Sequence, residues 1–270
     1  YANYRTTNTN KLFESYLSYN SGSKWEKQPL EVVAGYSYQD WDTYSPNNPT
    51  WNEAQDSIIA PEAAFPFYTR NVLMSYYGRA IYNYDGKYVL NVSVRRDGSS
   101  RFSPDTRWGI FPAASAAWLI SEEAFLKDSK TVNMLKLRAG WGVTGQQDGI
   151  GDYSYIGNYF QGATTAQYAF GGQYYQVLRP AGFDANLKWE TTTSYNLGLD
   201  FGFKNDRFSG SLDVYQKDTR DLLATVPVPA GTNFTNEILT NVGAMQNRGI
   251  EASVNTGIIA KKDMRLDWSI

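Results

Sequence analysis

The chain has 270 residues, with 25 Lys and Arg against 27 Asp and Glu, and it contains neither cysteine nor histidine. That composition excludes disulfides, thiolate nucleophiles, Ser-His-Asp triads and zinc sites with sulfur or nitrogen ligands, so we expect no metal site and no cofactor. The net charge of -2 predicts no nucleic-acid partner, and no apolar run approaches the roughly 20 residues of a transmembrane helix.

Segments that alternate apolar and polar residues recur along the chain, which is typical of strands with two different faces. In chain order they span 30–38, 88–95, 135–144, 194–204, 208–214 and 250–258. Most are about ten residues long, near the ~9–11 residues of a strand that crosses a bilayer and longer than the usual ~5–6 of globular sheets. The lengths favour a transmembrane β-barrel over a soluble sheet.

The connections between these segments alternate in length. Short ones span 20–28, 85–87, 204–207 and 260–264, and long ones span 39–70, 97–106, 146–187 and 217–246. Every second connection of an up-and-down barrel lies on the same side of the membrane, so we expect short periplasmic turns and long outer loops. Asp85-Gly86 and Lys204-Asn205-Asp206-Arg207 suit tight turns, because Gly, Asn and Asp tolerate positive φ.

One connection of intermediate length, 121–133, opens with a predicted helix. Its segment Ser121–Lys127 has acidic residues in the first turn and a lysine at its end, which matches the helix dipole. We place this helix on the side of the short turns.

The polar positions of the alternating segments are candidates for the wall of an aqueous lumen, because such groups cost several kcal/mol in hydrocarbon. For any single residue, a purely structural role is favoured, with hydrogen bonds across the wall or to a plug. The residues predicted to face the lumen are Arg95, Arg138, Asn196, Asp200 and Glu251, and with them Asn91, Lys136, Asp213, Lys217 and Asn255. The run 95–102 has Arg, Gly and Ser but no phosphate-loop spacing, which favours a loop base tied by Arg-Asp pairs over an anion site.

Aromatic residues concentrate in the predicted long loops, where rings can stack on sugars or clamp peptides. Packing within the loops, or a partner protein, would use the same rings. The candidate ligand contacts are Trp41, Trp51, Tyr153, Tyr155, Tyr159, Tyr174 and Tyr175. Five tryptophans near strand ends are predicted to lie at the membrane surface, namely Trp108, Trp118, Trp141, Trp189 and Trp268.

Several strings occur in the order typical of one known family. They include Tyr76-Tyr77-Gly78-Arg79, Ser93-Val94-Arg95-Arg96-Asp97-Gly98-Ser99-Ser100-Arg101-Phe102, Arg107-Trp108-Gly109 and Asn247-Arg248-Gly249-Ile250-Glu251. Over about residues 72–267 the chain resembles the barrel of SusC/RagA TonB-dependent outer-membrane proteins.

The resemblance implies a barrel of about 22 strands that is closed by an N-terminal plug. It also implies localisation in the outer membrane, energy coupling through the TonB complex, and a SusD-like surface lipoprotein as partner. The expected activity is uptake of oligosaccharides or peptides without covalent chemistry, and siderophore uptake stays open. We expect residues 1–270 to be part of such a barrel, without its plug domain and final strands.

Two other classes remain as alternatives. A soluble β-sandwich that binds carbohydrate or mediates adhesion predicts short strands and loops of mixed length. A carboxylate-dependent glycosidase requires two acidic groups about 5–10 Å apart in a cleft, and the acidic pairs Glu122/Glu123 and Asp218/Asp221 are the candidates.

Overall fold

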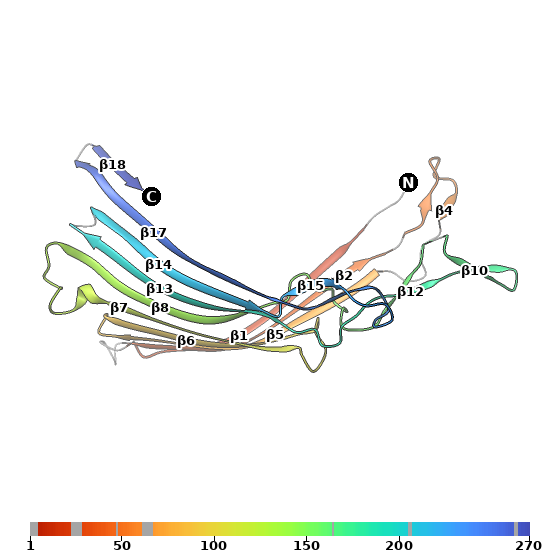
Figure 1. Cartoon of the computed structure of the whole chain (residues 1–270), viewed down its shortest axis with the longest axis horizontal. Coiled ribbons are helices and arrows are strands. Elements are labelled where there is room, and N and C mark those ends of the chain that lie inside the picture. The colour runs from red at the N-terminus through yellow and green to blue at the C-terminus, as the bar shows by residue number, and fades with distance from the viewer. Residues whose placement is uncertain are drawn as a thin grey trace.

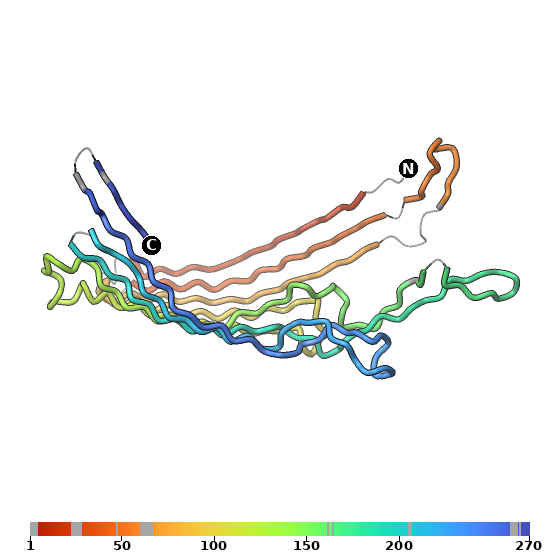
Figure 2. Tube along the Cα trace, turned by 45° about the horizontal axis from the view of Figure 1, so that its top comes forward, coloured from red at the N-terminus to blue at the C-terminus, as the bar shows by residue number. Residues whose placement is uncertain are grey.

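The computed structural model describes residues 5–22, 29–46, 48–60, 67–163, 165–204, 207–261 and 264–270. Ten long antiparallel strands form one sheet, and their order in the sheet is their order in the chain. The sheet bends into an open trough (Figures 1 and 2). Its strands are β1 (Thr7–Asn20), β2 (Leu30–Ser45), β5 (Phe67–Tyr84), β6 (Tyr88–Ser99), β7 (Trp108–Leu119), β8 (Val132–Gln146), β13 (Glu190–Phe203), β14 (Phe208–Arg220), β17 (Ala244–Lys261) and β18 (Met264–Ser269).

The long connections carry four small two-stranded sheets and lie at one end of the trough, opposite the short turns (Figure 1). The pairs are β3 (Thr50–Trp51) with β4 (Ile58–Ala60), β9 (Tyr159–Gln161) with β12 (Leu178–Pro180), β10 (Gln167–Phe170) with β11 (Gln173–Gln176), and β15 (Leu223–Pro227) with β16 (Glu237–Asn241). The predicted alternation of short and long connections is confirmed. Asp85 and Gly86 adopt the positive φ of a tight turn, whereas 23–28, 205–206 and 262–263, within the other short turns, lie outside the described residues.

The sheet has two chemically different faces, because directly paired residues of neighbouring strands point to the same side. One row joins Val92 to Ala80 and Ala114, and another joins Leu197 to Ala139 and Val214. Side chains of this face, which we call the apolar face, are largely exposed, and no second sheet covers them in the part of the chain that is described. This arrangement excludes the β-sandwich alternative.

Aromatic rings form a row near each end of the apolar face. Toward the long loops, Phe13, Tyr36, Tyr76 and Trp108 form a row across the five strands from β1 to β7, with neighbouring ring centroids 5.2–6.4 Å apart and no ring from β6. Tyr84, Tyr88 and Trp118 form the row beside the short turns. Two aromatic rows that flank an apolar band are the pattern of a transmembrane barrel.

Trp141 and Trp268 also lie exposed on the apolar face, but the prediction for Trp189 is wrong. Trp189 is only 7% exposed, and its indole N–H donates to the Arg107 carbonyl. It packs with Phe102, Ile150 and Leu187 in a buried cluster at the loop end of the sheet. A tryptophan beside a strand end can pack inside the loops or contact lipid, and sequence position alone does not distinguish the two.

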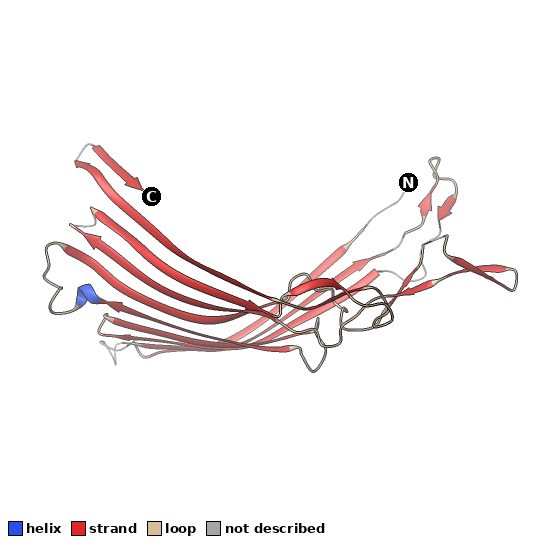
Figure 3. Cartoon of the chain, in the orientation of Figure 1, coloured by secondary structure: helices blue, strands red, loops and turns tan. Residues whose placement is uncertain are grey.

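The predicted helix Ser121–Lys127 is also wrong. Only a single 3-10 turn, η2 (Ile120–Glu122), forms there, and it is the one helix among the described elements (Figure 3). Glu123 has an extended backbone, and its carboxylate accepts hydrogen bonds from Tyr88 and Trp118. These contacts hold the segment against the sheet. In the described ranges no helix is long and apolar enough to cross a membrane.

Candidate functional site

The face opposite the apolar face, here called the polar face, carries a network of charges centred on Arg138. The Arg138 guanidinium donates to both carboxylate oxygens of Asp200, at 2.8 and 2.7 Å, and to Asp213 at 3.1 Å. Lys136 Nζ lies 3.6 Å from the Asp200 carboxylate. These side chains come from β8, β13 and β14, so the network ties three neighbouring strands together.

The network depends on a glycine in the middle strand. A Cβ at Gly198 would lie 2.4 Å from Asp213 Oδ1 and 2.7 Å from an Arg138 nitrogen. Because Gly198 has no side chain, the guanidinium can cross over β13 and reach the third strand. The missing side chain at Gly198 therefore leaves a gap on the polar face of β13, and the Arg138 side chain passes through this gap.

The remaining predicted lumen residues lie on the same face. Asn196 pairs with Tyr215, and Glu251 lies directly opposite Asp213. Glu251 is exposed and adds a second acidic group beside the Arg138 network. Around Arg138 the polar face therefore carries three acidic and two basic side chains, namely Asp200, Asp213 and Glu251 with Arg138 and Lys136.

Arg95 forms a second polar cluster on β6. Its Nε donates to Asp97 at 2.7 Å, and one of its terminal nitrogens donates to the buried Ser75 hydroxyl at 2.8 Å. Further along, Arg101 pairs with Asp152 at 3.2 Å and so connects this strand to the long loop after β8. The interpretation of 95–102 as a loop base tied by Arg-Asp pairs is confirmed.

A polar groove of about 470 Å³ opens at the loop end of β1, β2 and β5. Trp41 is its one ring, and it lies within β2 because that strand runs to Ser45, seven residues beyond the predicted end. The prediction of Trp41 as a loop residue is therefore wrong, although its place in a groove suits ligand contact. The other lining residues are Asn8, Thr9, Asn10, Asp42, Thr43, Asn71, Arg101, Gln147 and Asp148.

The groove presents hydrogen-bonding groups rather than apolar surface. Thr43 donates to the side-chain oxygen of Asn8, and Gln39 donates to that of Asn10, which orients both amide nitrogens as donors. The Oε1 atom of Gln147 is buried and accepts no hydrogen bond from the described residues. A buried acceptor without a donor costs about 1–3 kcal/mol, so a ligand hydroxyl or N–H there would be stabilising. Sequence reasoning missed these amides because Asn and Gln are common in every long loop.

The other six candidate rings are spread over the outer loops instead of lining one site. Tyr174 and Tyr175 lie on the β10–β11 hairpin, where Tyr175 stacks on Tyr168, and Tyr159 on β9 contacts Phe234. The Tyr153 hydroxyl accepts the backbone N–H of Arg70. Trp51 belongs to β3, and Tyr155 is half-buried in the turn region before β9. Their role as ligand contacts stays a prediction.

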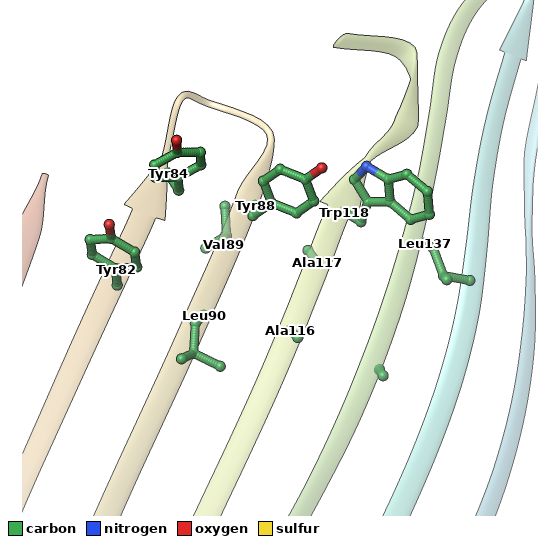
Figure 4. Close-up of a pocket in the computed structure, with 10 residues that line it drawn as sticks. Tyr82, Tyr84, Tyr88, Val89, Leu90, Ala116, Ala117, Trp118 and Leu137 are labelled. Carbon is green, nitrogen blue, oxygen red and sulfur yellow. The ribbon is translucent and has the colours of Figure 1, made fainter. Parts of the chain in front are cut away.

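At the opposite end of the sheet, a shallow depression of about 240 Å³ lies between the rings of Tyr84, Tyr88 and Trp118 (Figure 4). The polar tips of Tyr88 and Trp118 donate to Glu123 at 2.6 and 3.0 Å, and Lys87 lies 3.5 Å from the same carboxylate. These hydrogen bonds lower the pKa of Glu123, first the one from Tyr88 and then the one from Trp118. Glu123 therefore joins the β5–β6 hairpin to the connection that follows β7.

The family model for the TonB dependent receptor-like β-barrel matches residues 1–270. The chain belongs to the TonB-dependent receptor β-barrel family. The TonB-dependent receptor SusC of Bacteroides thetaiotaomicron is 45% identical over 231 residues, which are 86% of this chain and 22% of SusC. TonB-dependent receptor P39 of Formosa agariphila is 35% identical over 272 residues, 95% of this chain and 24% of P39. The chain thus spans about a quarter of the length of these relatives.

Solved structures agree with this receptor barrel assignment at the level of the fold. The RagAB peptide transporter superposes with a TM-score of 0.80 at 22% identity over 98% of this chain and 29% of that one. The siderophore receptor PirA from Pseudomonas aeruginosa gives a TM-score of 0.60 at 15% identity over 98% of this chain and 42% of that one. The receptor barrel is of the SusC/RagA type.

Family membership fixes the location of the barrel, which is the outer membrane. The contact of the apolar face with lipid and of the polar face with the lumen stays a prediction. The family consists of receptors and transporters, so the chain is not an enzyme. Three of the four acidic residues considered for catalysis have structural partners. Glu123 accepts from Tyr88 and Trp118, Asp218 accepts from Gln216 and Gln246, and Asp221 pairs with Lys188.

Proposed function

We propose that the full-length protein imports oligosaccharides or peptides across the outer membrane, with energy from the TonB complex. The observation that carries the proposal is the polar groove around Trp41, which lies where the long loops meet the sheet. Its ring and amide groups suit a flexible, hydroxyl-rich or amide-rich solute. The 45% identity to SusC supports a role in uptake, and the likeness to the RagAB peptide transporter keeps peptides among the candidates.

A SusD-like surface lipoprotein is the proposed partner, and it would cover the loop end of the barrel. The exposed rings of the β10–β11 hairpin, including Tyr174 at 75% exposure, lie at that end and offer a surface for such a lid. Rings exposed on one side of a barrel mouth are typical of protein interfaces. A tagged full-length receptor should retain the lipoprotein after detergent extraction, and absence of any co-purified surface lipoprotein would contradict the partnership.

Growth tests the uptake itself. A strain that lacks the gene should fail to grow on one panel of oligosaccharides or peptides supplied as sole carbon source, and the wild-type gene should restore growth. Growth of the deletion strain on every tested solute at the wild-type rate would contradict the proposal.

The groove is tested by complementing that strain with Trp41→Ala. We expect uptake at limiting solute to fall about tenfold, which corresponds to roughly 1.4 kcal/mol of binding free energy. Trp141→Ala is the matched control, because this ring lies on the apolar face, on the opposite side of the sheet from the groove. Equal surface levels of both variants, measured by immunoblot, exclude an assembly defect. If the two variants import equally well, the groove does not contact the solute.

A further inference from the structure

Among the arginines of the apolar face, Arg96 and Arg248 lie in the rows of Tyr76 and Tyr195 respectively, whereas Arg70 and Arg220 lie nearer the loop ends of their strands. On the polar face the arginines of the strands have partners, as Arg138 has with Asp200. No carboxylate among the described residues pairs with Arg96 or Arg248, and both are exposed. A guanidinium that faces lipid without a counterion is costly, so each of these two requires a partner from its surroundings.

The surroundings of the two arginines differ. The Arg96 guanidinium lies over the Trp108 ring, 4.6 Å from its centroid. This cation–π contact takes the place of a counterion. Arg248 has no such ring contact among the described residues, but it borders a groove of about 660 Å³. Six side chains of the apolar face line this groove, from β13, β14 and β17: Tyr195, Leu197, Val214, Gln216, Arg248 and Ile250.

The groove is polar at one end and apolar at the other. Arg248, Gln216 and Tyr195 share one row across the three strands, and Ile250, Val214 and Leu197 form the next row of this face toward the short turns. Cationic and hydroxyl groups above a strip of aliphatic side chains match an amphiphile whose anionic headgroup points toward the long loops. The volume lies within the ~300–1,000 Å³ of sites for small ligands.

The height of Arg248 places this headgroup at the outer boundary of the membrane. Thr256, which pairs with Phe208 at the short-turn end, lies eight residues further along β17. Eight residues span roughly 26 Å along a strand, or about 20 Å of height at a tilt near 40°. Because the hydrocarbon band of such barrels is about 25 Å tall, the guanidinium lies near its outer edge.

We propose that this groove is a binding site for lipid A, the phosphorylated glycolipid of the outer leaflet. One phosphate binds the Arg248 guanidinium, the planar donor that matches phosphate geometry. One acyl chain lies along Leu197, Val214 and Ile250, and Gln216 and Tyr195 face the sugar of the headgroup. The site is independent of solute uptake, because it lies on the opposite side of the sheet from the groove of Trp41.

The test uses the purified full-length receptor, with bound lipid measured by native mass spectrometry and by titration of lipid A in mixed micelles. Arg248→Gln should weaken the binding of lipid A about tenfold, whereas Arg96→Gln, which removes the same charge from the same face without a groove, should leave it unchanged. Val214→Trp fills the groove, keeps the arginine, and should weaken binding as well. Each variant must retain the heat-resistant folded form on an unboiled gel.

Two further titrations separate the sources of the phosphate. Lipid A stripped of its phosphates should bind weakly, and its binding should not respond to Arg248→Gln. Phosphatidylglycerol should bind weakly too, because it presents one smaller headgroup and fewer acyl chains. The proposal is overturned if Arg248→Gln retains as much lipid A as the wild type, or if phosphatidylglycerol or the stripped lipid binds equally well.

Discussion

At the scale of single residues, Arg138 is the group on which the lumenal wall depends most. It neutralises two aspartates, and Glu251 lies directly opposite one of them. Without the guanidinium, three carboxylates would lie on neighbouring strands with only Lys136 to offset them. The arginine side chain is about one third exposed, so solvent screening reduces the energy of each pair.

Gly198 provides the sharpest test of this network. Gly198→Ala places a methyl group where Asp213 and Arg138 now meet, so we expect the Arg138–Asp213 hydrogen bonds to break. The expected loss is about 1 kcal/mol, measured as a lower thermal unfolding temperature of the full-length receptor in detergent. Gly140→Ala is the matched control, because a Cβ at Gly140 meets no atom within 4 Å. Equal unfolding temperatures for the two variants would show that Arg138 does not need the gap.

The side chains of the wall were predictable from sequence, but their pairing was not. Alternation alone placed Arg138, Asp200 and Glu251 on one face, because a strand turns every second side chain the same way. The register that brings Arg138 to Asp213 joins two residues that are 75 positions apart in the sequence. The wrong prediction of Trp41 as a loop residue has a similar cause. No local sequence pattern shows how far β2 continues past the end of its alternating segment.

At the scale of elements, the short turns are more constrained than their length suggests. Glu123 lies in the segment between β7 and β8, and its carboxylate accepts hydrogen bonds from Tyr88 and Trp118. The β5–β6 and β7–β8 hairpins therefore share one anchor. This anchor replaces the helix that the acidic first turn predicted. Local helix propensity was overridden by contacts with Tyr88, which is 35 residues away in sequence, and with Trp118 at the end of the preceding strand.

The anchor makes stability depend on pH in a defined direction. Because the pKa of Glu123 is lowered in the folded chain, its stabilisation is complete above the ordinary value of 4.5 and is lost as pH falls through the lowered value. We expect the unfolding temperature of Glu123→Gln to be lower than that of the wild type at pH 7, and the difference to shrink at acidic pH. Scanning calorimetry from neutral to acidic pH measures this.

Glu122→Gln is the control for that experiment. It removes one charge from the same turn, but no hydrogen bond or ion pair connects Glu122 to the described residues. Its difference from the wild type should stay constant with pH. A constant difference for Glu123→Gln as well would show that the carboxylate does not act as the anchor.

At the scale of the whole molecule, the assignment of the two faces predicts opposite responses to the same added charge. Val92→Arg places a cation on the apolar face, four residues from Tyr88 and from Arg96 and therefore near the middle of the bilayer. This should cost about 2–4 kcal/mol and reduce the amount of folded receptor in outer-membrane fractions.

Ser115→Arg is the matched case, since Ser115 is exposed on the polar face of the neighbouring strand. It should assemble at the wild-type level. Similar levels for the two variants would mean that the apolar face does not contact lipid.

The strict agreement between strand order in the sheet and strand order in the chain has a consequence for biogenesis. Each new strand pairs with the one made just before it, so the wall can grow at a single advancing margin as the polypeptide is delivered. Of the junctions between the ten strands, the longest gap lies between β8 and β13, where 43 residues separate the two partners. Closing that loop costs the most chain entropy. The pairing of β13 with β8 should therefore be the slowest step of insertion.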